Sequence, residues 1–186
     1  MAGARMTPAQ MDTARSLAVS TSRGTRIAPV RPALGFALDA TTLPEVHAWA
    51  AREHVDCEDA RAGFVTCSHV DPIAIGRPAI EGAIDELDLG FDVRGHLVNV
   101  TTLRSHMRSE NAAKAARDMA LWLSTRLGPA DRASGGPFDA NRLAVAGADS
   151  LATVGYRYRD YFADVMAMNL PASGASVREH YMSANN

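Results

Sequence analysis

Residues 84–104 read IDELDLGFDVRGHLVNVTTLR and carry the clearest strand pattern in the chain. Apolar and polar residues alternate on both sides of Val93-Arg94-Gly95, which predicts two antiparallel strands joined by a short loop with glycine in the left-handed conformation. If Asp92 pairs with His96, alternate residues share one face of this hairpin. The predicted core face comprises Leu87, Leu89, Phe91, Leu97 and Leu103, with Asn99 and Thr101 on the same side.

Residues 55–70 predict another hairpin with a similar glycine-containing loop. A three-residue loop pairs Ala60 with Phe64 and, three steps further out, Cys57 with Cys67. The two cysteines then become direct neighbours on adjacent strands.

The cysteine pair is the sharpest chemical feature of the sequence. Directly opposed positions match the geometry of a disulfide, so Cys57 and Cys67 are disulfide candidates, more so in an exported protein than in a cytosolic one. A zinc site is an alternative, in which Cys57, Cys67 and His69 supply three ligands and the fourth is not identified. A third interpretation is two small apolar side chains in a packed sheet.

Two helices are predicted to flank these hairpins. Ser109 can cap a helix over residues 110–127, and Gly128 then stops it. Thr42 can cap a shorter helix that ends near His54. We therefore predict an α+β fold, an antiparallel sheet of hairpins with one long and one shorter helix packed on one face.

The C-terminal part alternates in the manner of strands from residue 152 to residue 183. Asp160 and Asp164 interrupt the alternation, which predicts either two strands or one long bent strand with a bulge near Asp160, followed by a final strand near the C-terminus. The Gly- and Pro-rich residues 128–141 predict a loop, either a mobile lid or a surface excursion.

The 186 residues are 47% apolar and 22% charged, values that predict one hydrophobic core. Residues 20–35 are rich in Ser, Thr, Gly and Pro, so we expect a partly flexible N-terminal arm over residues 1–35. The remaining residues, 36–186, are expected to form a single domain.

The formal net charge of -2 provides no positive field for a phosphate backbone, so nucleic acid is not an expected partner. No apolar run approaches the about 18 residues of a membrane span, and none resembles a secretory signal. These features indicate a cytoplasmic protein, or an envelope protein whose export signal was removed. Lys114 is the single lysine among 19 basic residues, which is typical of a high-GC bacterial source.

Residues 156–161, YRYRDY, concentrate aromatic and charged side chains. In one interpretation they form a pocket in which Arg157 and Arg159 bind an anionic ligand. Asp160, Tyr161 and His180 are then candidate acid and base groups. The other interpretation is an amphipathic strand with aromatic rings inward and charges outward. Neither interpretation requires a cofactor.

Four short segments resemble the SmpA/OmlA-type fold, the family of outer-membrane assembly lipoproteins. They lie within residues 36–104 and read FAL (36–38), TTLPEV (41–46), LDLGFD (87–92) and GHLVNV (95–100). The resemblance implies an α+β fold and a noncatalytic adaptor that binds other proteins through its sheet or its helix face. It implies no individual binding residue.

The sequence contains none of the common hydrolase or nucleotide-binding motifs. Our first hypothesis is therefore a noncatalytic protein-binding or assembly subunit of a bacterial complex, with another protein or a second copy as partner. The alternatives are a small cofactor-independent enzyme or anionic-ligand-binding protein, and an inhibitor or immunity protein.

Overall fold

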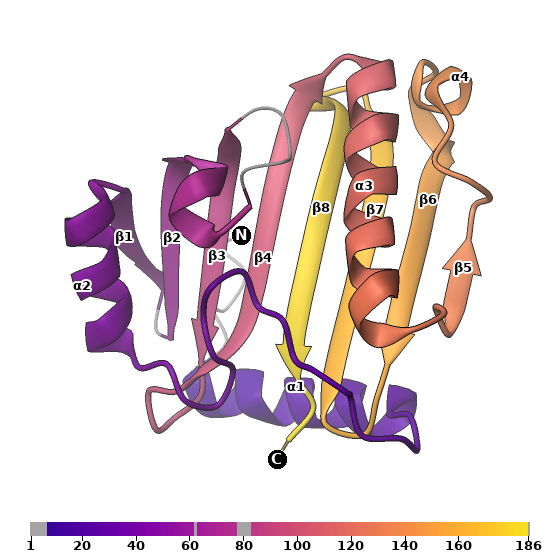
Figure 1. The fold of residues 1–186 in the computed structure, drawn as a ribbon. Coiled ribbons are helices and arrows are strands. Elements are labelled where there is room, and N and C mark those ends of the chain that lie inside the picture. The colour runs from indigo at the N-terminus through magenta and orange to yellow at the C-terminus, as the bar shows by residue number, and fades with distance from the viewer. Residues whose placement is uncertain (1–6, 62, 78–82, 186) are drawn as a thin grey trace, which may run out of the picture.

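The computed structural model describes residues 7–61, 63–77 and 83–185 (Figure 1). Eight strands form one antiparallel sheet in the order β1-β2-β3-β4-β8-β7-β6-β5. Their bounds are β1 Asp56–Arg61, β2 Phe64–Val70, β3 Ile84–Phe91, β4 Leu97–Met107, β5 Arg132–Ser134, β6 Gly147–Arg157, β7 Tyr161–Leu170 and β8 Gly174–Ser183. The helices are α1 Pro8–Ser22, α2 Leu43–Glu53, the 3-10 helix η1 Pro72–Ile75, α3 Ser109–Leu127 and α4 Ala140–Leu143.

The two faces of the sheet are covered differently (Figure 1). The main core joins the inward residues of the strands to Val46 of α2 and Met119 of α3, so α2 and α3 lie on the same face, here called the helix-covered face. Val19 of α1 belongs instead to a separate small cluster with Phe162 and Ala184. Of the helices in the described part of the chain, only α1 lies on this opposite, open face, at one end of the strands.

The mixed α+β class predicted from the sequence is confirmed, and both expected helices form. At α2, Thr42 and Glu45 make the expected reciprocal cap. At α3 the predicted cap is wrong by one residue: the cap is Arg108, and Ser109 is already helical. The first helical hydrogen bond explains the shift, because the Ala112 amide donates to the Arg108 carbonyl at 2.9 Å.

In the first hairpin the predicted register of the cysteines holds. Cys57 lies opposite Cys67, and the two are joined by a disulfide. The predicted pairing of Ala60 with Phe64 is wrong, because an irregularity in β1 places Arg61 opposite Phe64. Both sulfurs are consumed by the disulfide, so the zinc alternative does not form.

In the second hairpin, the prediction of which β4 side chains face the core is wrong for the residues that follow Leu97. Phe91 lies opposite Leu97, but Gly90 lies opposite Asn99, so Val98 is an extra residue on β4. One extra residue exchanges the two faces of a strand. Leu103, Asn99 and Thr101 therefore lie on the open face, and the core face contains Val100, Thr102 and Arg104 instead.

The C-terminal half forms the two strands and the final strand that the alternation predicts. β6 and β7 meet at a turn around Asp160, and β8 inserts between β4 and β7. β6 begins at Gly147, earlier than the predicted residue 152. The predicted loop over residues 128–141 contains the short edge strand β5, which pairs with β6.

The N-terminal segment is tied to the sheet by hydrogen bonds. Arg15 Nη1 donates to the carbonyls of Ser183 and Asn185, at 3.2 and 3.1 Å. The Arg159 amide donates to the Arg26 carbonyl at 2.7 Å. Residues 1–6 of the predicted arm lie outside the described residues. No helix in the described ranges is long and apolar enough to cross a membrane.

Replacing both cysteines, Cys57→Ala/Cys67→Ala, is expected to lower the free energy of unfolding by about 2 to 3 kcal/mol, because the disulfide closes a short loop in the unfolded chain. Chemical denaturation of the wild type and the double variant measures this difference. With reductant present the two proteins should unfold at nearly the same denaturant concentration. Equal stability of both proteins without reductant would contradict the prediction.

Candidate functional site

The register of the sheet aligns three rows of side chains across the open face. Directly paired residues point to the same side, so each row can be followed from strand to strand. The Leu103 row comprises Asp56, Ser68, Glu86, Leu103, Arg178, Met166, Thr153 and Ser134. The Thr101 row comprises Glu58, Thr66, Asp88, Thr101, His180, Asp164, Gly155 and Arg132. The Met182 row comprises Phe64, Gly90, Asn99, Met182, Phe162 and Arg157.

Charge is divided between the two halves of this face. In the Leu103 and Thr101 rows, the charged residues of β1 to β3 are the four carboxylates Asp56, Glu58, Glu86 and Asp88. Strands β8 to β5 contribute the basic side chains of Arg178, His180, Arg157 and Arg132, together with one carboxylate, Asp164. Within the described ranges, none of the four carboxylates of β1 to β3 takes part in an ion pair.

Asp164 is the centre of the polar network on the basic half. Its side chain is only 7% exposed and lies 3.6 Å from Arg157 Nη2, 3.4 Å from Arg178 Nη2 and 3.1 Å from His180 Nδ1. Burial by itself raises the pKa of Asp164, but the hydrogen bond and charge of His180, with the charges of the two arginines, outweigh it. The pKa of Asp164 therefore lies below its ordinary value.

His180 is held at both ring nitrogens. Nδ1 faces Asp164, and Nε2 lies 2.6 Å from Asn99 Oδ1. Asn99 Nδ2 in turn donates to Thr101 Oγ1 at 3.3 Å, which leaves the amide oxygen to accept from the imidazole. Both ring nitrogens are therefore engaged by side chains of the neighbouring strands β7 and β4.

The acidic half contains a close pair of carboxylates. Thr66 Oγ1 donates to Asp88 at 2.6 Å. Partial burial raises the pKa of neighbouring Glu86, and the negative charge and hydrogen bonding of Asp88 raise it further. The two carboxylates therefore repel each other on the acidic half.

The structure separates the residues that the sequence suggested as one pocket. Arg157 and His180 meet at Asp164 on the open face. Asp160 lies in the β6–β7 turn, where it accepts a hydrogen bond from the Ala28 amide at 2.9 Å. Tyr161 points into the core and donates to the Pro32 carbonyl at 2.6 Å.

Arg159 is also apart from the others. It is exposed in the β6–β7 turn, next to Asp160. His69, the third residue of the zinc hypothesis, is exposed on β2 at an unpaired position. Neither residue joins the Asp164 network.

A second charged cluster is buried beneath α3. Glu179 is fully buried on the helix-covered face and pairs with Arg77 and with Arg104, whose Nη1 lies 3.6 Å away. Tyr181 donates to Glu179 at 2.7 Å, and the Arg77 guanidinium lies 4.0 Å from the centre of the Trp122 ring. Burial lowers the pKa of Arg104 and raises that of Tyr181 well above its ordinary value. These groups face the core, so we assign them a structural role.

Asp164, Arg178 and Glu179 are not among the site residues expected from the sequence. For Glu179 the sequence does contain a signal of burial, because Glu179 alternates with Val177 and Tyr181 and so shares their core face. The role of Asp164 had no such signal, since its partners Arg157 and His180 come from two other strands.

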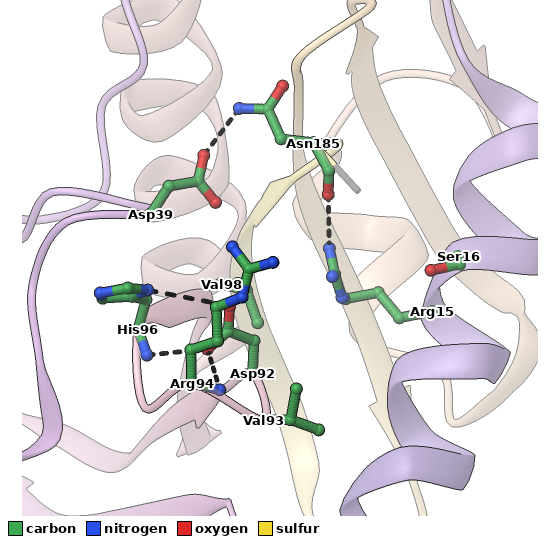
Figure 2. A pocket seen from close by; sticks show the side chains of 9 residues that line it. All are labelled: Arg15, Ser16, Asp39, Asp92, Val93, Arg94, His96, Val98 and Asn185. Atoms are coloured by element: carbon green, nitrogen blue, oxygen red, sulfur yellow. Dashed lines mark hydrogen bonds and ion pairs between the residues drawn. The ribbon is translucent and has the colours of Figure 1, made fainter.

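A cavity of about 350 Å³ lies between α1, the β3–β4 turn and the C-terminus (Figure 2). Asp92 in its wall accepts hydrogen bonds from the amides of Arg94 and His96, both at 2.9 Å. Asp39 accepts from Asn185 at 2.8 Å, and Arg15 donates to the carbonyl of the same asparagine. These bonds join three chain segments, so we interpret the cavity as the junction that holds α1 in place.

No protein-family model, curated protein or solved structure matches the chain. Within the described ranges, no group of three or more His, Cys, Asp or Glu side chains is placed to hold a metal ion. The candidate site is therefore defined by the geometry of the open face.

Asp164→Asn is expected to lower the free energy of unfolding at neutral pH by about 1 to 3 kcal/mol, because the amide cannot balance the surrounding cations. Since the folded-state pKa lies below the ordinary 3.8, the carboxylate stabilises the fold fully above about pH 4, and this contribution is lost as the pH falls through the lowered value. Urea unfolding as a function of pH measures the difference, with exposed Asp149→Asn as control. A difference that persists unchanged in strong acid would contradict this account.

Glu179→Gln is expected to destabilise the fold by about 3 to 5 kcal/mol, because two buried arginines lose their shared counter-charge. Thermal and chemical unfolding measure the effect. The matched control is Glu53→Gln on α2, whose carboxylate pairs with Arg52 at the surface and should change stability by about 0.5 kcal/mol or less. Similar losses in both variants would contradict the assignment of a buried ion cluster.

Proposed function

We propose that the chain is a noncatalytic protein-binding or assembly subunit of a bacterial complex, and that it binds its partner through the open face of the sheet. The observation that carries this proposal is the division of charge along the rows, with unpaired carboxylates on β1 to β3 and a cationic group on β8 to β5. Opposite charges held on one rigid surface favour a partner with the complementary pattern.

The state of the polar groups favours binding over catalysis. The acid and base candidates Asp160, Tyr161 and His180 lie in different surroundings, and both nitrogens of His180 are engaged. The cavity at α1 is lined by carboxylates that already accept hydrogen bonds from neighbouring residues. The resemblance of residues 36–104 to the SmpA/OmlA-type adaptors agrees with the same proposal.

The disulfide adds a proposal about compartment. Stable disulfides form mainly in oxidising surroundings such as the bacterial periplasm or the cell surface. Cys57 and Cys67 are joined on the edge hairpin of the sheet. We therefore favour a cell-envelope location over the cytoplasm.

A photo-reactive amino acid in place of Leu103 tests the proposed surface. Leu103 lies at the middle of the open face, whereas Leu121 is exposed on α3 over the opposite face. In an extract of the native cell, irradiation should give a discrete protein adduct from position 103 and none from position 121. Either another protein or a second copy counts as the partner, and mass spectrometry identifies it.

The Arg178→Glu substitution supplies the second half of this test. It reverses one charge of the open face and should reduce the yield of the adduct by about tenfold, as expected for a surface that selects its partner by charge. No adduct at position 103, or equal adducts at positions 103 and 121, would refute the proposed function.

A further inference from the structure

The open face has room for one more element beside α1. Val19 of α1 packs with Phe162 and Ala184. The helix therefore covers the Met182 row and the end of the sheet next to it. Rows are about 7 Å apart, because each residue advances a strand by about 3.3 Å. Two packed helices have their axes about 8 to 10 Å apart. A second helix at this distance from α1 would therefore lie over the Thr101 and Leu103 rows.

α1 itself determines which elements fit this space. A helix is about 10 Å in diameter with its side chains, so α1 stands out from the sheet and would hold the flat sheet of a second molecule away from the two free rows. A nucleic acid would meet the unpaired carboxylates of β1 to β3. A single helix placed beside α1 avoids both conflicts.

The charges orient such a helix. Basic side chains complement Glu86 and Asp88, and acidic side chains complement Arg178 and Arg157 at the other end. Acidic residues at the start of a helix and basic residues at its end are also the distribution that the helix dipole favours. The complementary helix therefore begins over β6–β8 and ends over β2–β3.

The direction of α1 agrees with this arrangement. Ser16 of α1 lines the cavity at the β3–β4 turn, and Gly24, just beyond the helix, donates to the Tyr158 carbonyl near the end of β6. α1 thus runs from the β3–β4 side toward β6 (Figure 1). The second helix would run antiparallel to α1, so that the two helix dipoles oppose each other.

We propose that the partner of the open face is an α-helix that lies across the strands beside α1, with acidic residues in its first turns over β6–β8 and basic residues in its last turns over β2–β3. This inference rests on the proposed function. The span from β2 to β6 is five strand spacings, about 24 Å, which corresponds to about 16 helical residues. Leu103 and Met166 lie along the middle of this track and offer apolar contact.

A pair of synthetic helical peptides tests the proposal. The first is an alanine-based peptide of about 18 residues with glutamates in the first two turns, leucines in the middle and lysines in the last two turns. The second has the same composition with the lysines first and the glutamates last. Fluorescence anisotropy is expected to show at least about tenfold tighter binding of the first peptide to the full chain.

Two double variants locate the binding. Glu86→Lys/Asp88→Lys is expected to weaken binding of the first peptide by about tenfold or more. Glu53→Lys/Asp118→Lys changes the net charge equally, on α2 and α3, and should leave binding unchanged. Circular dichroism verifies that both variants are folded.

A spin label at either end of the first peptide measures its direction. The label at the first residue should broaden amide signals of Thr153 and Met166, and the label at the last residue those of Thr66 and Asp88. Equal affinity for both peptides, or no binding at about millimolar concentration, would overturn the helix proposal. If the adduct at position 103 still forms in that case, the proposed function stands with a different partner shape; if the adduct is absent, both fail.

Discussion

The extra residue Val98 in β4 determines which side chains each face of the sheet presents. Residues in a strand alternate between faces, so one insertion exchanges the faces of everything that follows it. Asn99, Thr101 and Leu103 are thereby placed on the open face, and Thr102 and Arg104 are placed in the core. β8 pairs with β4, so the same choice sets Glu179 inward and His180 outward.

Two polar networks lie on opposite sides of the sheet. On the inner side, Glu179 is fully buried between Arg77 and Arg104. The attraction within such a cluster mainly offsets the cost of burying the charges, so the cluster adds little net stability, but the loss of one partner is costly. On the outer side, Asp164 gathers Arg157, Arg178 and His180, each from a position that the register dictates. The inner network joins β8 to Arg77 and to β4, whereas the outer network reaches β4 only through the contact of His180 with Asn99 in the described part of the chain.

The open face carries charges that no ion pair within the described residues balances. Its basic half shares the single carboxylate of Asp164, while Glu86 and Asp88 repel each other on the acidic half. α1 covers one end of this face and is held there by bonds from Arg15 to the backbone near the C-terminus. The fixed helix at one end and the opposite charges along two uncovered rows are the basis of our proposal that this face binds an external segment.

Local sequence determined much of the architecture. Alternation, glycine loops and caps were sufficient for both hairpins, for α2 and α3, for the final strands and for the opposition of Cys57 and Cys67, because these features depend on neighbours within about ten residues. The bulge at Val98 interrupts the alternation inside a hairpin that is otherwise regular, and the edge strand β5 and the insertion of β8 between β4 and β7 depend on distant partners. The chemistry of Arg157 and His180 was sufficient to mark them as candidates. Only the pairing of β6, β7 and β8 brings them to Asp164. Side chains on different strands meet where the register of the folded sheet aligns them, and a single segment of sequence does not contain that register.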